Sequence, residues 1–182
     1  MNTAPAGIDK HRLAGLQDGV YSIALTLLVL ELKLPPLHGG FSDAQLWASL
    51  LELWPKVLTW MLSFWVLSVF WLGDVRAAAA ATAVDHRVLM LALWKLALVS
   101  LLPFSTALMG EHGSRAPASA LYAGHIAALS LLQFARAVHL RRSRALVNWT
   151  DEDARRAVVK SALILACALL ALGLAFVAPA YN

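Results

Sequence analysis

The sequence predicts an all-α fold, a polytopic transmembrane helical bundle, and three observations support this. Hydrophobic residues make up 60% of the chain and charged residues only 14%, and the mean hydropathy is +0.67. The apolar residues gather into runs of about twenty, the length a helix needs to cross a bilayer. These runs lack the alternation of apolar and polar residues that a membrane β-barrel would show. A soluble domain of this size is not expected from such a composition.

The apolar runs define about five spans in a single transmembrane domain covering residues 1–182. The expected spans are residues 12–32, 43–72, 88–109, 118–138 and 157–177. The first run carries no Ala-x-Ala cleavage pattern, so it is interpreted as a retained span and not as a signal peptide. The second run is longer than a bilayer requires, and Pro55 is expected to kink it so that its first part lies in the interface. The third run contains Pro103, and a basic stretch separates the last two.

The charges between the runs predict the orientation of the chain. If the N-terminus is cytoplasmic, the inside segments hold Lys10, Arg12, Arg76, Arg87, Arg136, Arg141, Arg142, Arg144, Arg155 and Arg156. The outside turns then hold little beyond Lys33 and Arg115. Lys and Arg accumulate on the cytoplasmic side of membrane proteins, so we expect a multi-pass protein with its N-terminus inside. The net charge of +4 is therefore attributed to membrane topology, and no nucleic-acid partner is expected.

The first span carries a stripe that mixes hydroxyls with bulky aliphatic side chains. Its members are Ser22, Ile23, Thr26, Leu27 and Leu30. At about 100° per residue, Thr26, Leu27 and Leu30 all lie within about 60° of Ile23. Such a face is suited to line a narrow pore. It is equally compatible with an ordinary packed helix whose Ser and Thr hydroxyls bond to their own backbone.

Polar residues near the ends of the spans are expected to form a structural network, because an unpaired charge in a bilayer is costly. The candidates are Arg12, Gln17, Asp18 and Asp74. Asp18 lies about 140° from Ile23 on the helical wheel, so it should face neighbouring helices. Asp74 is expected at the cytoplasmic edge, with Arg12 or Arg76 as its partner.

Two further polar residues lie deep inside apolar runs. Lys95 either extends its ammonium to the cytoplasmic interface or pairs inside the bundle. His125 either forms a hydrogen bond between helices or acts as a proton sensor or ligand. The sequence contains no nucleophile paired with a base, no metal-ligand spacing and no phosphate-binding loop. We therefore expect neither an enzyme nor a bound cofactor.

Three segments resemble a known family. Arg12-x-x-x-Leu16-Gln17-Asp18, followed by the run from Ser22 to Leu30, is similar to the first helix of the transmembrane protein 175 family of potassium channels. The segment Trp54-Pro55-Lys56 resembles part of its second helix, and Leu102 to Glu111 resembles the end of its third. The order of these segments is also that of the family.

The resemblance implies a bacterial-type homotetramer, in the plasma (inner) membrane, whose first helices surround a central pore. By motif, Ile23 matches a narrow hydrophobic constriction, and Leu27 and Leu30 match further pore-lining positions. Thr26 matches a pore threonine linked to potassium preference, with potassium in transit nearby, and Ser22 a small residue beside the constriction. Like the family, this chain lacks the Thr-Val-Gly-Tyr-Gly filter of ordinary potassium channels.

This chain departs from the family pattern in three places. Leu16-Gln17 replaces the usual Phe-Ser pair, and Trp71-Leu72-Gly73-Asp74 stands where histidines often follow the tryptophan. Family members usually have six spans, whereas five are expected here. The implied function is a potassium-selective ion channel subunit, whose partners are identical subunits, membrane lipid and permeant potassium ions. The alternatives are a small secondary transporter and a structural membrane subunit.

Overall fold

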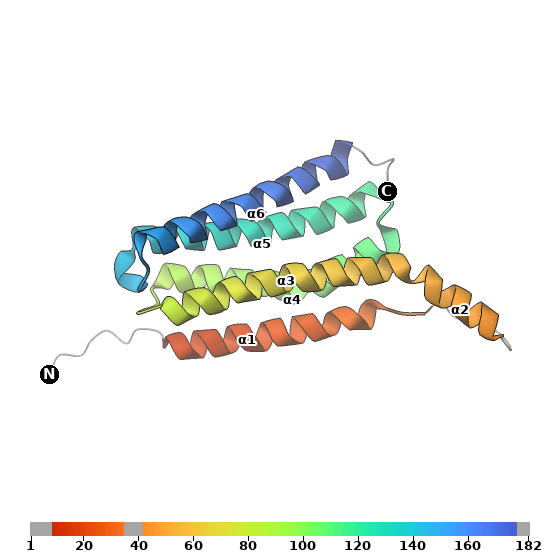
Figure 1. Cartoon of the computed structure of the whole chain (residues 1–182), viewed down its shortest axis with the longest axis horizontal. Coiled ribbons are helices and arrows are strands. Elements are labelled where there is room, and N and C mark those ends of the chain that lie inside the picture. The colour runs from red at the N-terminus through yellow and green to blue at the C-terminus, as the bar shows by residue number, and fades with distance from the viewer. Residues whose placement is uncertain (1–8, 35–41, 178–182) are drawn as a thin grey trace.

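The structure is a computed structural model that describes residues 9–34 and 42–177 (Figure 1). The helices in these ranges are α1 (Lys10–Leu27), η1 (Leu28–Glu31), α2 (Asp43–Glu52), α3 (Trp54–Ala80), α4 (His86–His112), α5 (Ala116–Arg142), η2 (Arg144–Leu146) and α6 (Asp151–Val177). Five of the six α-helices are long and apolar enough to cross a membrane, η1 counting with α1. The all-α, five-span prediction is confirmed.

The five long helices lie side by side along the long axis of the molecule (Figure 1). α1 contacts α3 and α4, while α5 packs between α4 and α6. The apolar core joins four of these helices and η1, through Tyr21, Leu28, Phe70, Val99 and Leu129. α6 buries little of its surface in the bundle, so most of its apolar side chains face outward.

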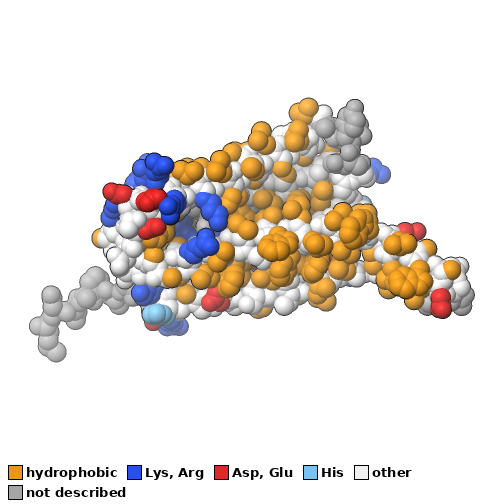
Figure 2. Space-filling model, viewed as in Figure 1, with side chains coloured by type: hydrophobic (Ala, Val, Ile, Leu, Met, Phe, Trp, Pro, Cys, Tyr) orange, Lys and Arg blue, Asp and Glu red, His pale blue; other side chains and the backbone are white. Residues whose placement is uncertain are grey.

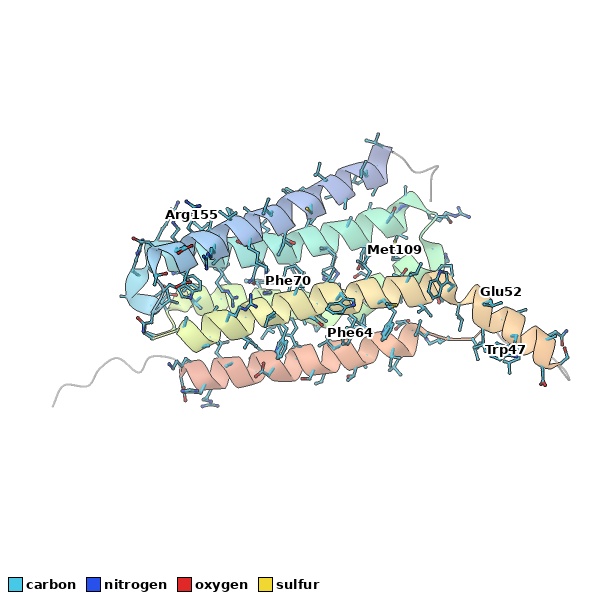
Figure 3. All side chains as sticks on the ribbon, in the orientation of Figure 1. Trp47, Glu52, Phe64, Phe70, Met109 and Arg155 are labelled. Atoms are coloured by element: carbon cyan, nitrogen blue, oxygen red, sulfur yellow. The ribbon has the colours of Figure 1, made fainter. Side chains whose placement is uncertain are left out.

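The second apolar run is divided into two helices. The capping box of Ser42 and Gln45 starts α2, which ends at Glu52. α3 then begins at Trp54 with Pro55 in its first turn. Proline is tolerated there because N–H groups in the first turn have no partner within the helix. The chain is therefore interrupted just before Pro55, and the proline does not kink a continuous helix as expected. At ten residues α2 is too short to cross a bilayer, and Figure 3 shows its Trp47 and Glu52 side chains beyond the end of the bundle.

The long helices also extend beyond the predicted spans, because polar residues and alanines at their ends continue the helical turns. The clearest case is α3, which was expected to end at residue 72 and continues to Ala80. Alanine is the strongest helix former, and Ala77 to Ala80 prolong the helix. Asp74 consequently lies inside α3, six residues before its end, and not in a loop.

The loops at the basic end of the bundle are bonded to one another. Ala81, just after α3, forms an isolated β-bridge with Val147, just after η2. The Thr82 N–H donates to the Leu146 carbonyl at 2.9 Å, and the Lys10 ammonium donates to the Ala81 carbonyl at 2.8 Å. Lys and Arg side chains gather at this end in Figure 2. The start of α1 and the two loops thus form one connected basic surface.

Candidate functional site

The exposed face of α1 and η1 carries the predicted pore residues. These side chains, Ser22, Ile23, Thr26, Leu27 and Leu30, are all exposed on the surface of the chain. Ile23 is 60% exposed and Leu30 59%, although both are large apolar side chains inside a candidate membrane span. The opposite face of the same helices is buried in the bundle through Tyr21, Ala24 and Leu28. One face of the first span therefore packs against the other helices of the chain, and the opposite face is exposed.

The change from α-helix to 3₁₀-helix after Leu27 keeps this exposed face straight. A 3₁₀-helix has three residues per turn, so side chains three apart lie directly above one another. Leu30 is therefore aligned with Leu27 along the axis. Leu28, within the same turn, is fully buried and fixes η1 to α3 and α4.

The Thr26 hydroxyl has a defined orientation. It donates to the main-chain carbonyl of Ile23 at 2.9 Å and is also within 3.1 Å of the Ser22 carbonyl. Because the hydroxyl hydrogen is directed at the helix backbone, the oxygen lone pairs are left to face away from it. Gly15 and Gly19 lie on the same side of α1, and a Cβ added to either would meet no atom within 4 Å. The surface around Thr26 and Gly19 is thus open.

The predicted structural network is only partly brought together. Gln17, Asp18 and Asp74 line one cavity of about 320 Å³ between α1 and α3. The indole of Trp71 on α3 donates to the Asp18 carboxylate at 2.9 Å, although Asp18 remains exposed. Arg12 lies on the exposed side of α1.

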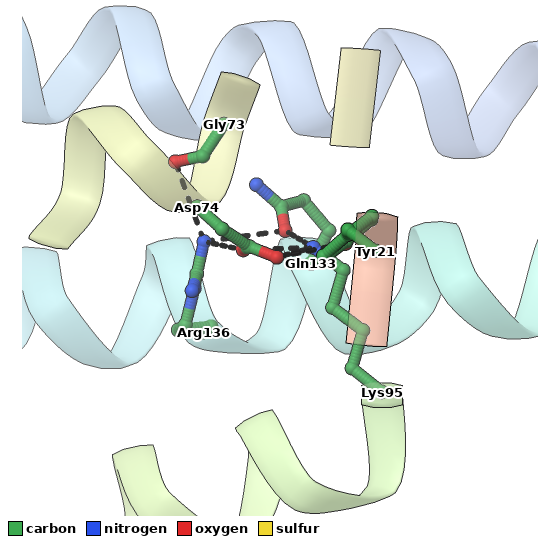
Figure 4. Close-up of polar contacts among 6 residues, drawn as sticks. All are labelled: Tyr21, Gly73, Asp74, Lys95, Gln133 and Arg136. Atoms are coloured by element: carbon green, nitrogen blue, oxygen red, sulfur yellow. Dashed lines mark hydrogen bonds and ion pairs between the residues drawn. The ribbon is translucent and has the colours of Figure 1, made fainter. Parts of the chain in front are cut away.

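Asp74 is the centre of a buried ionic cluster (Figure 4). The Lys95 ammonium donates to its two carboxylate oxygens at 2.9 and 3.0 Å, and the Tyr21 hydroxyl donates at 2.8 Å. The Arg136 guanidinium forms an ion pair with the same carboxylate. The expected pairing of Asp74 with Arg12 or Arg76 is wrong, because the extended α3 places Asp74 against α4 and α5. Arg136, counted above as a charge between spans, is buried within α5.

Gln133 completes the buried ionic cluster. Its side-chain oxygen accepts hydrogen bonds from Lys95 and, at 3.3 Å, from Arg136. The Lys95 ammonium also lies 5.2 Å from the centre of the Phe70 ring. Lys95 is 2% exposed, so of its two predicted alternatives the structure adopts pairing inside the bundle. Gln133 and Arg136 were not assigned to this cluster from sequence, although their spacing of three residues puts them on one helix face.

A second set of hydroxyl contacts joins α3, α4 and α5. The Thr106 hydroxyl donates to Ser63 at 2.9 Å, and Ser63 lies 2.9 Å from the Tyr122 hydroxyl. His125 is held by the Ser105 hydroxyl at 2.8 Å and the Leu98 carbonyl at 2.9 Å, both on α4. His125 thus forms the hydrogen bonds between helices that were one of its two predicted roles.

Taken together, the five membrane-length helices and the buried ionic centre that joins four of them define a polytopic helical membrane protein. Residues 12–103 match the family described as endosomal/lysosomal potassium channel TMEM175. The chain belongs to the TMEM175 family, which confirms the resemblance noted from sequence.

Two relatives indicate how far this similarity extends. A potassium channel of Chamaesiphon minutus is 36% identical over 135 residues, which cover 72% of this chain and 66% of that protein, slightly under two thirds. A potassium channel of Streptomyces collinus is 32% identical over 175 residues, covering 93% of this chain and 84% of that one.

Two solved structures share the fold. The crystal structure of a lysosomal potassium-selective channel TMEM175 homolog from Chamaesiphon minutus superposes with a TM-score of 0.69 at 31% identity, covering 94% of this chain and 95% of that one. A variant of the potassium channel MtTMEM175 superposes with a TM-score of 0.68, covering all of this chain and 87% of that one. At 16% identity the second match concerns the fold alone.

Proposed function

We propose that this chain is the subunit of a potassium-selective channel, a homotetramer whose central pore is lined by α1. The observation that carries the proposal is the open face of α1, which combines Ile23 and Leu30 with the hydroxyls of Ser22 and Thr26. Family membership supports it, because the relatives described above are potassium channels. The sequence contains no internal repeat, so a symmetric pore requires several copies of the chain.

Ile23 forms the hydrophobic constriction in this proposal. Four Ile23 side chains around an axis would close a narrow ring, and Leu27 and Leu30 would continue the apolar lining toward the other end of the pore. A hydrophobic ring of this kind gates by dewetting, because an ion must lose much of its hydration to pass.

Thr26 supplies the oxygen ligands for potassium in transit. Its hydrogen is used by the helix backbone, so the oxygen is free to accept a cation. Ser22 lies one turn earlier and adds a second small hydroxyl beside the constriction. The permeant ion is the only non-protein component this mechanism needs, and no cofactor or catalytic group takes part.

Assembly into a tetramer is supported by Asp18. This carboxylate lies within the candidate membrane span Lys10–Glu31, yet it is exposed on the isolated chain. A carboxylate that faces lipid is costly. A neighbouring subunit covering α1 would remove Asp18 from lipid.

We further propose a bacterial plasma (inner) membrane location with a cytoplasmic N-terminus. The helix directions bring the start of α1, the end of α3 and the α5–α6 loop to one end of the bundle. Most Lys and Arg side chains gather there, which is the arrangement of the cytoplasmic side.

Ion flux through purified protein in liposomes tests this function. In the closed state, Ile23→Asn should wet the constriction and raise the basal potassium current severalfold. The matched control is Val29→Asn, an exposed position of η1 that lies off the stripe. If Ile23→Asn leaves the conductance of a well-folded tetramer unchanged, α1 does not form the constriction. Slow, saturable flux without single-channel events would favour the transporter, and the absence of flux would favour a structural subunit.

A further inference from the structure

We propose that the cavity between α3, α5 and α6 at the basic end of the bundle binds a phosphate-bearing anion, supplied by the headgroup of an anionic phospholipid. The cavity has a volume of about 300 Å³. This site is separate from the exposed face of α1, and the proposal does not depend on the channel function.

The charge of the cavity lining favours an anion. Four cationic side chains line it, namely Arg76, Arg136, Arg156 and Lys160, together with one carboxylate, Asp153. The Asp153 carboxylate accepts the Thr150 N–H at 3.1 Å and the Thr150 hydroxyl at 2.6 Å, so it is engaged at the start of α6. Arg156 also pairs with Glu152, which leaves Arg76 and Lys160 as the side chains best placed to receive a ligand.

The buried ionic cluster next to the cavity gives an independent reason to expect a bound anion. Asp74 pairs with both Lys95 and Arg136, so one buried carboxylate faces two buried cations. Several acceptors surround the Lys95 ammonium, which is the environment of a protonated amine. An excess positive charge inside a membrane bundle is unfavourable unless an anion compensates it. Arg136 also lines the cavity, so an anion bound there would lie against that excess charge.

The shape and position of the cavity favour a lipid as the source of the anion. Its apolar lining includes Val69, Phe70 and Ile164, which lie nearer the middle of the bundle than the basic side chains do. A headgroup phosphate could therefore occupy the basic part while an acyl chain follows the apolar part. Clusters of Lys and Arg at the membrane surface bind anionic headgroups in this way, through charge-assisted hydrogen bonds to phosphate oxygens.

The test compares two double variants of the full-length protein with equal net charge. Arg76→Gln with Lys160→Gln alters the cavity and leaves the buried ionic cluster intact. Arg142→Gln with Arg155→Gln removes two exposed charges at the same end of the bundle, at positions outside the cavity lining (Figure 3 labels Arg155). Retention of phosphatidylglycerol is measured by native mass spectrometry, with phosphatidylcholine as the zwitterionic lipid. A parallel arm adds inorganic phosphate to delipidated protein and follows thermal unfolding. Helix content from circular dichroism checks that both variants fold.

We expect the cavity variant to retain phosphatidylglycerol about tenfold more weakly than the control variant, since it loses two charge-assisted contacts to phosphate. Phosphatidylcholine should be retained equally by both. Stabilisation by inorganic phosphate alone, lost in the cavity variant, would support the anion site and overturn the lipid as its source. The proposal as a whole is wrong if the two folded variants lose phosphatidylglycerol equally and respond equally to phosphate.

Discussion

At the scale of single residues, the carboxylate of Asp74 has the greatest consequence for stability. It is 2% exposed and bonded to Lys95, Arg136 and Tyr21, so three helices depend on it for a partner. Breaking a buried ion pair by removing one partner leaves an uncompensated charge and costs about 3–5 kcal/mol. Because one carboxylate faces two cations, removing Asp74 should cost more stability than removing Lys95.

We predict that Asp74→Asn destabilises the protein more than Lys95→Met does. Asp74→Asn leaves Lys95 and Arg136 as two buried cations without an anion. Lys95→Met keeps the Asp74–Arg136 pair and the Tyr21 hydrogen bond. Thermal unfolding of the detergent-solubilised protein measures the difference, which should approach about 3 kcal/mol. Equal losses, or a larger loss for Lys95→Met, would mean that the cluster is not governed by its excess positive charge.

Thr26 is the residue on which potassium preference depends in the proposed pore. Thr26→Ala removes the hydroxyl oxygen, so the reversal potential under bi-ionic potassium and sodium conditions should move toward zero while current remains measurable. Thr26→Ser keeps the oxygen and is the matched control, expected to stay near the wild-type value. A reversal potential identical in all three proteins would remove Thr26 from the conduction path.

At the scale of elements, the junction of the α3–α4 loop with the end of α5 contains the best-defined pH-sensitive contact. Asp85 caps α4 by accepting the Val88 N–H at 2.7 Å, and His139 on α5 bonds to it at 2.7 Å. Partial burial raises the pKa of Asp85, but the hydrogen bonds from Val88 and His139 outweigh this effect, and the nearby Arg87 acts with them. The pKa of Asp85 is therefore held below its usual value.

This shift predicts how stability depends on pH. Because the pKa is lower in the folded state, the carboxylate stabilises the fold in full above the unfolded pKa of about 4. The contribution is lost as the pH falls through the folded pKa. An acidic side chain at a helix start contributes about 0.5 kcal/mol, and Asn retains the cap without the charge. We expect Asp85→Asn to unfold earlier than wild type at pH 6, and this difference to shrink as the pH falls below about 4. A difference in unfolding temperature that stays constant over this pH range would contradict the prediction.

The packing of α3 against α5 is close at Gly73, which lies within the helix Trp54–Ala80. A Cβ at this position would lie 2.6 Å from the Gln133 amide nitrogen, so the flexible Gln133 side chain would have to shift to accept one. The Gly73 carbonyl also accepts a 3.5 Å hydrogen bond from the Arg136 guanidinium, so Gly73 contacts the ionic cluster.

At the scale of the whole molecule, the proposed tetramer would have to cover the exposed Asp18. We predict that Asp18→Asn lowers the tetramer fraction while the subunit fold is retained, because the Asn carbonyl can still accept from the Trp71 indole. In the proposed tetramer the lost charge lies at the contact with the next subunit, and losing a buried ionic contact costs about 3–5 kcal/mol. Size-exclusion chromatography in detergent measures the loss.

Trp71→Phe is the control for this variant, since it removes the bond within the subunit and keeps the charge. It should assemble better than Asp18→Asn. A normally assembled Asp18→Asn protein with altered ion selectivity would place Asp18 on the conduction path and reverse the orientation proposed for α1.

The fold class and the number of long helices could be predicted from the sequence because lipid imposes a length and a hydropathy on each span. The spacing of Ser22, Ile23 and Thr26 likewise predicted their common face, since helix periodicity is local. The pairing of Asp74 could not be predicted in this way. It depended on where α3 ends, and that end is determined by tertiary contacts and by alanines whose hydropathy alone does not mark a span.

The sequence by itself determined the membrane-spanning class of this protein, its five long helices, its charge asymmetry and the stripe on its first span. These properties follow from local composition and periodicity, which need no knowledge of neighbours. Only the tertiary structure decided that Lys95, Gln133 and Arg136 converge on Asp74, and that the stripe is left open on the subunit surface. The physical reason is that ion pairs and exposure depend on residues far apart in the chain, brought together by helix packing.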